Sequence, residues 1–242
     1  MSSGLQDCQD NGISHPVAPL PVPQQVKAQL ILAQIHLDAG CAEEAFSCFA
    51  IAARSGHPVA LNMLGRAYER GWGVKRNPAL AACCFEAAVR GGDGWAMFNL
   101  ADLFFTGEGV PKDHRRAYRL YVDAARSGNA KALNMLGLMH EEGTAPEGKP
   151  DPESARQFYQ AAAEGGDCWA WLNLGRLSLE DGEWPDAAEA FGKALDAAVD
   201  GVPEAVLGLI RPYVQKPVFQ AVLSRCLAKH GVSSDKRVCH AA

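Results

Sequence analysis

A six-residue segment recurs along this chain almost unchanged, at intervals of 36 to 38 residues. ALNMLG begins at Ala60 and again at Ala132, and the related segments AMFNLA and AWLNLG begin at Ala96 and Ala170. A fixed period of about 20 to 50 residues is typical of repeat architectures, in which each unit packs mainly against its neighbours. We therefore predict a linear array of similar structural units.

A second pattern, an alanine followed four residues later by an aromatic residue, has the same period. It occurs at Ala45 and Phe49, Ala81 and Phe85, Ala117 and Tyr121, Ala155 and Tyr159, and Ala187 and Phe191. Eleven residues after each of the first four alanines stands a glycine: Gly56, Gly92, Gly128 and Gly166. Twenty residues after the same alanines comes the small residue of the first pattern: Gly65, Ala101, Gly137 and Gly175. Four identical offsets in succession define one repeating unit.

These positions predict a pair of helices in each unit. Apolar residues recur at helical spacing over segments of about 12–15 residues, a length typical of helices rather than strands. The small residue lets one helix approach its neighbour closely, and the recurrent glycine suits the left-handed position that ends a helix. Because two helices cannot bury their apolar faces alone, the units must stack. The predicted fold is all-α, an α-α superhelix of about six antiparallel helix pairs.

The distance from the small residue to the next alanine–aromatic pattern separates two kinds of unit. It is 16 residues in the first two long units, 18 in the third and 12 in the flanking units. The short spacing, and the Trp-x2-Leu-Gly form of residues 171–175, match tetratricopeptide units. The long units carry Gly-x-Gly-Val between their helices, at residues 71–74 and 107–110, but the third has Thr-Ala-Pro at 144–146 and two additional residues.

On these residues the chain resembles the Sel1-like repeat family, a relative of the tetratricopeptide repeats. The resemblance covers roughly residues 26 to 210. In the first long unit it is carried by Ala60, Leu64, Gly65, Tyr68, Gly71, Gly73, Val74, Ala81, Ala88 and Gly92. It implies an α-α superhelix that serves as an adaptor or scaffold. Similar proteins act in signalling complexes, membrane-protein quality control and bacterium–host contacts.

The two ends of the chain depart from the repeat. Residues 1–25 are rich in proline and are expected to form a flexible N-terminal arm, or alternatively a short partner-binding motif. The solenoid is expected over residues 26–231 and a flexible tail over residues 232–242. A final helix at about 217–230 is expected to cap the last unit, as a solenoid requires; docking of a partner on it is the alternative.

Charge and hydropathy disfavour several classes of partner. The net charge of −5, without clustered Lys and Arg, argues against nucleic acid as a ligand. No apolar run reaches the ~18 residues that span a bilayer, and the first residues lack the basic and apolar regions of a secretory signal. A cytoplasmic protein without membrane insertion is therefore expected, with its eight cysteines as free thiols.

In such a solenoid the first helices of successive units line the concave surface. Positions −6, −3, +1 and +4 from the small residue form one stripe of this surface. The residues expected there to contact a protein or peptide are Asn62, Arg66, Trp95, Phe98, Asp102, Phe105, Asn134, Leu138, Trp169, Leu172 and Arg176. The aromatic side chains would anchor the partner, and the asparagine and arginine side chains would clamp it. For Trp95 and Trp169, packing against the preceding second helix is the alternative.

The sequence contains no convincing catalytic or metal-binding motif. His-Glu-Glu at residues 140–142 lacks the second histidine of the HExxH motif, and His140 is expected in the seam between units. Ser-Ser-Asp-Lys at 233–236 has the form S-x-x-K but no KTG partner. The C-terminal cysteines and histidines lack the paired spacing of a zinc site; they are Cys226, His230, Cys239 and His240. We expect no catalytic residue, no metal and no cofactor.

The predicted function is that of a protein-binding adaptor or scaffold. It would hold a peptide or partner protein in the concave groove, without a small-molecule substrate. Two alternatives from other classes stay open at this stage. One is a regulatory subunit that switches a partner enzyme or sensor by docking, and the other is a hydrolase.

Overall fold

The computed structural model describes residues 21–197 and 201–229, and within these ranges the secondary structure is helical, without strands. The α-helices of these ranges form six pairs. The first helices of the pairs are α1 (Gln24–Asp38), α3 (Pro58–Arg70), α5 (Gly94–Thr106), α7 (Ala130–Glu142), α9 (Cys168–Glu180) and α11 (Val202–Ile210). The second helices are α2 (Ala42–Ala53), α4 (Pro78–Arg90), α6 (His114–Arg126), α8 (Pro152–Glu164), α10 (Trp184–Asp196) and α12 (Gln220–Lys229). The all-α fold predicted from the repeats is confirmed.

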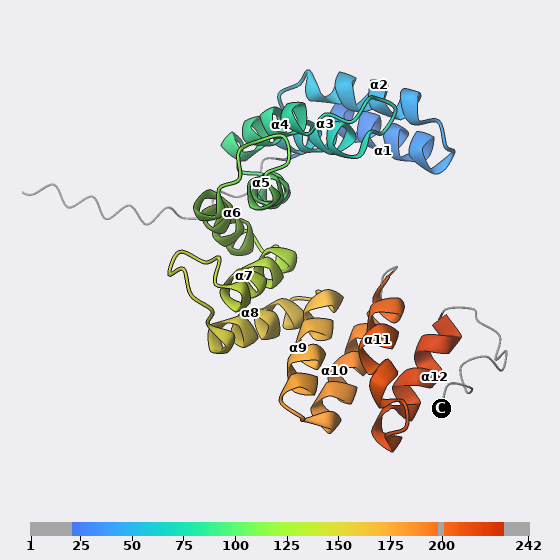
Figure 1. Ribbon diagram of the computed structural model, residues 1–242. Helices are drawn as coiled ribbons and strands as arrows, with labels where there is room; N and C mark the ends of the chain where they lie inside the picture. The colour runs from blue at the N-terminus through green and yellow to red at the C-terminus, as the bar shows by residue number, and fades with distance from the viewer. Residues whose placement is uncertain (1–20, 198–200, 230–242) are drawn as a thin grey trace, which may run out of the picture.

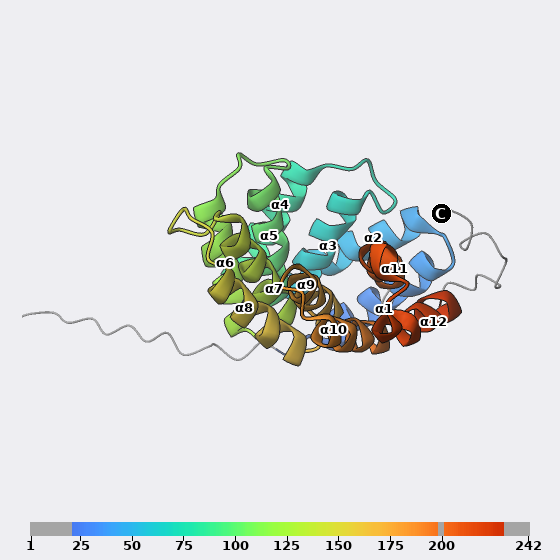
Figure 2. The same cartoon turned by 60° about the horizontal axis from the view of Figure 1, so that its bottom comes forward.

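The pairs stack into an arc (Figure 1), with α1–α4 in one arm, α5–α7 at the bend and α8–α12 in the other arm. The view turned by 60° (Figure 2) shows α3, α5, α7 and α9 towards the inside of the curve, and α4, α6, α8 and α10 around the outside. Inner helices also contact one another across units, α3 with α5 and α7 with α9. The first helices of the units therefore form the concave surface.

The two sequence patterns meet inside each unit. A Cβ atom placed on Gly65 would lie 2.5 Å from the Phe85 ring, and one placed on Gly175 would lie 2.5 Å from the Phe191 ring. Both rings are completely buried. The missing side chain on the first helix thus makes room for the aromatic ring of the second, and this contact sets the distance between them.

Side-chain oxygens cap three of the inner helices, α5, α7 and α9, at their N-terminal ends. Asp93 Oδ1 accepts a hydrogen bond of 2.7 Å from the backbone N–H of Ala96 at the start of α5. Asn129 Oδ1 and Asp167 Oδ1 cap α7 and α9 in the same manner. These caps satisfy backbone donors that have no partner within the helix. Because the units stack in register, the three caps lie along one edge of the concave surface.

The third long unit accommodates its additional residues in the loop between α7 and α8. The backbone N–H of Asp151 donates to the carbonyl of His140 over 2.8 Å, as that of Asp113 donates to the carbonyl of Phe104 over 2.9 Å in the preceding unit. The loop between α7 and α8 therefore starts and ends in the same way as the shorter loop between α5 and α6. The additional residues extend outward (Figure 1) and leave the stacking unchanged.

The C-terminal pair covers the end of the solenoid. Val222 and Cys226 of α12 are buried in one core cluster with Phe191 of α10 and Ile210 of α11. The helix expected at about 217–230 begins as a 3₁₀ turn, Pro217–Phe219, and continues as α12. In this position α12 has the geometry that a capping helix needs.

Several sequence expectations concern residues outside the described ranges. These include most of the arm expected at 1–25, the tail expected at 232–242, the segment 233–236 and the histidines and cysteine at 230, 239 and 240. Among the helices that the structure describes, none combines the length and the apolar character that crossing a bilayer requires.

Candidate functional site

Equivalent positions on α3, α5, α7 and α9 form four rows across the concave surface. The first row, near the N-terminal ends of the helices, consists of Val59, Trp95, Lys131 and Trp169. The second row consists of Asn62, Phe98, Asn134 and Leu172. The third row consists of Arg66, Asp102, Leu138 and Arg176, and the fourth of Glu69, Phe105, Glu141 and Leu179.

The first row holds two exposed tryptophans. Trp95 and Trp169 retain 54% and 36% of their accessible surface, which does not fit the core packing considered for them from the sequence. Between them, Lys131 Nζ lies 5.9 Å from the centroid of the Trp95 ring. The three side chains line a cavity of about 380 Å³ between the start of α5 and the turns that precede α7 and α9. We call this space the tryptophan cavity. Exposed aromatic rings around a hollow are typical of binding sites.

The two asparagines of the second row each accept a hydrogen bond from an asparagine of the next unit. Asn99 Nδ2 donates a hydrogen bond of 2.9 Å to Asn62 Oδ1, and Asn173 Nδ2 donates one of 2.9 Å to Asn134 Oδ1. Each pair joins one inner helix to the next and fixes the orientation of both amides. The Nδ2 atoms of Asn62 and Asn134 find no hydrogen-bond partner in the described part of the chain.

The apolar members of the second row differ in their surroundings. The half-buried Phe98 ring lies 6.2 Å from the Trp95 ring and 5.8 Å from the Tyr121 ring, measured between centroids. Leu172 retains only 8% of its accessible surface and belongs to the C-terminal core cluster. Phe98 therefore packs beside Trp95 without lining the tryptophan cavity, whereas Leu172 mainly supports the fold.

The third row contains a carboxyl group with an unusual environment. Tyr121 Oη donates a hydrogen bond of 2.5 Å to Asp102 Oδ1. Burial raises the pKa of Asp102 to about 6, although the hydrogen bond from Tyr121 opposes this change. Burial also raises the pKa of the Tyr121 hydroxyl, so the tyrosine remains a neutral donor.

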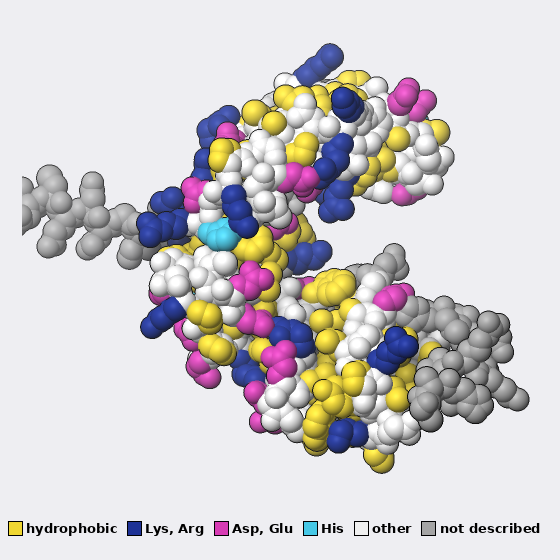
Figure 3. All heavy atoms as spheres, in the orientation of Figure 1, with side chains coloured by type: hydrophobic (Ala, Val, Ile, Leu, Met, Phe, Trp, Pro, Cys, Tyr) yellow, Lys and Arg dark blue, Asp and Glu magenta, His cyan; other side chains and the backbone are white. Residues whose placement is uncertain are grey.

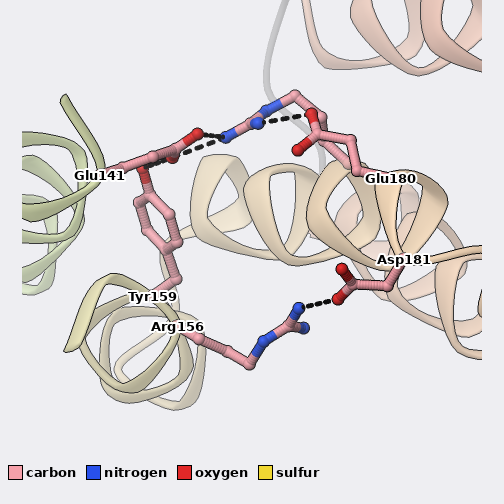
Figure 4. A network of polar contacts seen from close by, with 6 residues as sticks. Glu141, Arg156, Tyr159, Glu180 and Asp181 are labelled. Carbon is pink, nitrogen blue, oxygen red and sulfur yellow. Dashed lines mark hydrogen bonds and ion pairs between the residues drawn. The ribbon is translucent and has the colours of Figure 1, made fainter. Parts of the chain in front are cut away.

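A network of charged groups joins α7, α8 and α9 (Figure 4). Arg176 Nη2 contacts both carboxylate oxygens of Glu141 at 2.7 Å, and Arg176 Nη1 contacts Glu180 at 2.9 Å. Tyr159 Oη donates a further hydrogen bond of 2.7 Å to Glu141. Because these hydrogen bonds and charges outweigh desolvation, the pKa of Arg176 is raised. Arg176 is consequently held in place by the protein itself.

The remaining predicted contact residues are partly covered by neighbouring side chains. The Arg66 guanidinium lies 5.2 Å from the centroid of the Trp72 ring, and burial lowers its pKa. The Phe105 ring stacks on His114 with 5.2 Å between the centroids. Leu138 is half-buried. Of the predicted set, the structure places Trp95 and Trp169 in the lining of the tryptophan cavity and Phe98 beside Trp95. It buries Leu172 in the C-terminal core cluster and distributes the others along the groove.

Sequence reasoning missed the partners that orient these groups. Asn99 and Asn173 stand one position beyond the predicted stripe, and Lys131 was within the stripe but not among the predicted contacts. The sequence did contain one indication of the hydrogen-bond partners of Tyr121 and Tyr159. The two units with tyrosine at the aromatic position carry a carboxylate on the concave side, Asp102 or Glu141, for its hydroxyl.

Of the motifs dismissed from the sequence, the one at His140 lies within the described ranges. His140 is buried between Tyr118, whose hydroxyl lies 3.2 Å from His140 Nε2, and the Phe158 ring, which stacks on it at 5.1 Å. It lies in the seam between units, as expected. Among the described residues, no group of three or more His, Cys, Asp or Glu side chains is placed to hold a metal ion.

The stacked helix pairs and the rows of their inner faces define an α-solenoid of the kind that binds other macromolecules. The chain belongs to the Sel1 repeat family. The model of the Sel1 repeat matches residues 42–57, 58–93, 96–129 and 130–167, which together form more than half of the chain. Sel1-repeat solenoids are commonly protein-interaction scaffolds and are generally non-catalytic. A comparison with curated proteins found no match.

Solved structures with the same fold include a Sel1 repeat protein from Oxalobacter formigenes. It has a TM-score of 0.70 and 25% sequence identity, over 86% of this chain and 88% of that chain. The protective antigen c5321, present in uropathogenic Escherichia coli strains, has a TM-score of 0.64 and 23% identity, over 84% of this chain and 46% of that one. The immunity protein Pa5087 from Pseudomonas aeruginosa has a TM-score of 0.59 and 18% identity, over 87% and 84%. The last two similarities show the fold alone.

Proposed function

We propose that this chain is a protein-binding adaptor or scaffold that holds a peptide or partner protein on its concave surface. The observation that carries the proposal is the exposure of Trp95 and Trp169 on two inner helices, around one cavity. Large aromatic side chains in pockets dominate the binding energy of most protein interfaces. Covering each ring with a partner would contribute about 2 kcal/mol to binding.

The rest of the groove supports the same role. The free amide donors of Asn62 and Asn134 can bind carbonyl groups of a partner, since their other atoms are already fixed by Asn99 and Asn173. Preorganised donors reduce the entropy lost on binding. The proposal assigns the chain no chemical reaction and places it in the cytoplasm. The cysteines of the described ranges form no disulfide, which suits a reducing compartment.

The test compares capture of partners by two matched variants. Trp95→Ala combined with Trp169→Ala removes the exposed rings of the concave surface. Ile51→Ala combined with Leu80→Ala removes exposed apolar side chains from α2 and α4, on the outside of the curve. Both variants should keep the helical circular dichroism of the wild type, since each of the four side chains retains at least about a third of its accessible surface.

The expected result is a protein that the wild type and the outer-face variant capture from lysate and the tryptophan variant does not. The captured protein, once purified, should bind the wild type directly and saturably, with loss of about tenfold or more in affinity for the tryptophan variant. Equal capture by all three chains would overturn the proposal for the concave surface. A purified partner whose binding does not depend on either tryptophan would do the same.

A further inference from the structure

One face of α1 carries large apolar side chains that lie open to solvent. Ile31, Leu32 and Ile35 retain 61%, 42% and 56% of their accessible surface. No other helix of the described ranges carries more than one exposed large apolar side chain. Figure 3 shows hydrophobic side chains on the surface of the arm that contains α1 and α2. A contiguous apolar patch on a surface commonly marks an interaction site.

The repeat shows which kind of contact this face of α1 is built for. In the units that follow, the helix positions 5 and 1 residues before the small residue and 2 residues after it are apolar and lie against the preceding outer helix. In α5 these positions hold Ala96, Leu100 and Leu103, which retain 0%, 2% and 1% of their accessible surface. The first unit has Ala33 as its small residue, so the same positions of α1 hold Ala28, Leu32 and Ile35. All three are exposed. α1 therefore presents to solvent a face that its counterparts bury against another helix.

Charges of opposite sign stand at the two ends of this face. Lys27 lies one turn before Ile31, and Asp38 lies two turns after it, so all three share one side of α1. Both charged side chains are exposed, and Lys27 forms no ion pair within the described ranges. Asp38 accepts a hydrogen bond of 2.8 Å from Gln34 on the same helix. Along α1 the face is thus positive, then apolar, then negative.

Such a face is complementary to a second copy of itself. When two α1 helices pack antiparallel about a two-fold axis midway along the face, Lys27 of each copy meets Asp38 of the other. Ile31 and Ile35 of both copies then meet between the two ion pairs. A parallel arrangement would instead bring like charges together. A two-fold interface uses the same patch on both subunits, which this pattern of charges allows.

The other end of the solenoid is a poorer partner for α1. The exposed positions on α12 are occupied by small or polar residues, namely Gln220, Ala221, Ser224 and Ala228. None of the exposed large apolar side chains of the described ranges belongs to α11 or α12. A head-to-tail contact between copies would leave the isoleucines of α1 against these residues. Pairing of α1 with α1 covers apolar surface with apolar surface, and it closes after two subunits.

We infer that this chain forms a homodimer through antiparallel pairing of the exposed faces of its α1 helices. A single helix face is smaller than the roughly 800 Å² per partner of a standard stable interface. The dimer should therefore dissociate reversibly, with a Kd of roughly 1–100 μM. The inference is independent of the proposed function, because Trp95 and Trp169 lie on α5 and α9.

The first experiment measures the mass of the full chain by sedimentation equilibrium over a wide range of concentrations. Ile35→Glu places a charge in the centre of the face. Ile51→Glu is the matched control, because Ile51 is similarly exposed, at 48%, but lies on α2. Wild type and control should shift from one chain to two as the concentration rises. Ile35→Glu should bind itself at least about tenfold more weakly, with unchanged helical circular dichroism.

The second experiment exchanges the charges at the ends of the face. Lys27→Glu and Asp38→Lys each create two like-charge contacts in the symmetric dimer, so each variant alone should self-associate about tenfold more weakly. Neither change opposes the helix dipole, since the acid is near the N-terminus and the base near the C-terminus of α1. An equimolar mixture of the two variants should dimerise about as strongly as the wild type. In that mixed dimer both pairs have opposite charges again. Lys75→Glu, exposed in the loop before α4, is the control for net charge.

Each outcome decides for or against the α1 pairing. Recovery in the mixture, together with weakening in both single variants, supports the antiparallel arrangement. A chain that stays monomeric at all concentrations overturns the inference and leaves this face to another segment of the chain or to a different protein. A dimer that Ile35→Glu does not weaken places the interface elsewhere, and one insensitive to both charge variants overturns the antiparallel register. The capture experiment with the tryptophan variants is unaffected by any of these results.

Discussion

The hydroxyl of Tyr121 on α6 donates a hydrogen bond of 2.5 Å to the carboxyl group of Asp102 on α5. This bond joins the outer and inner helix of one unit at the bend of the arc. Desolvation raises the pKa of Asp102 to about 6, and the nearby Glu69 carboxylate adds to the effect, while Arg70 and Lys131 oppose it. The folded chain therefore holds this proton more tightly than the unfolded chain, in which the pKa of an aspartate is about 3.9.

Stability should consequently decrease as the pH rises through the interval between these two values. Below about pH 4 the carboxyl group is protonated in both states and contributes no pH dependence. Between about pH 4 and 6 the folded state binds more protons, so its free energy of unfolding falls by up to about 3 kcal/mol. Asp102→Asn keeps an oxygen for Tyr121 and removes this ionisation. We expect the variant to be more stable than the wild type at pH 7 and similar to it at pH 4, measured by urea denaturation.

Asp113→Asn provides the control for this substitution. Asp113 is an exposed cap of α6, and asparagine retains its capping oxygen. Its replacement should change the stability by less than about 0.5 kcal/mol at either pH. If Asp102→Asn shifted stability equally at pH 4 and pH 7, the gain would not come from ionisation of this group.

Arg176 should contribute more to stability than the exposed arginines of the same region. It contacts both oxygens of Glu141 at 2.7 Å, and both side chains are about three-quarters buried. Arg176→Met leaves Glu141 with Tyr159 as its partner, and we expect a loss of about 1.5–3 kcal/mol in chemical denaturation. Arg156→Met removes a more exposed pair with Asp181 and should cost less than about 1 kcal/mol. Similar losses for both variants would contradict the importance of burial here.

The asparagine pairs should hold neighbouring units together. Replacing Asn99 with leucine leaves Asn62 Oδ1 buried without its donor, which should cost about 1–3 kcal/mol. Replacing both residues with leucine should recover part of that loss, since no polar atom is then left unsatisfied. The difference between the double variant and the sum of the single variants gives the coupling energy. Strict additivity would show that the pair contributes nothing across the seam.

Much of the fold was predictable because the contacts that define it recur with the period of the sequence. The small residue and the aromatic residue recur in every long unit, and Gly65 and Phe85 meet in the core of their unit although the loop between their helices varies in length from unit to unit. The loop with its additional residues did not disturb the prediction. Its hydrogen bond from Asp151 to His140 preserves the spacing of the helices.

The candidate site was less predictable because it depends on contacts between units. Whether a position faces the groove or a neighbour depends on the pitch of the stack, which the repeat length does not determine. Leu172 illustrates this, since α11 and α12 do not follow the repeat and their core cluster buries it.

Glycines at two kinds of helical position should respond to the same substitution with opposite signs. A Cβ on Gly137 would lie 2.7 Å from the Tyr159 ring and 3.2 Å from the carbonyl oxygen of Ala155. Because the ring is completely buried and cannot move aside, Gly137→Ala should destabilise the chain by about 1–3 kcal/mol. A Cβ on Gly208, within α11, would meet no atom within 4 Å, so Gly208→Ala should stabilise the chain by about 0.5–1 kcal/mol. Thermal unfolding of both variants measures the two effects, and a loss at both positions would show that close packing extends to a helix where the structure has open space.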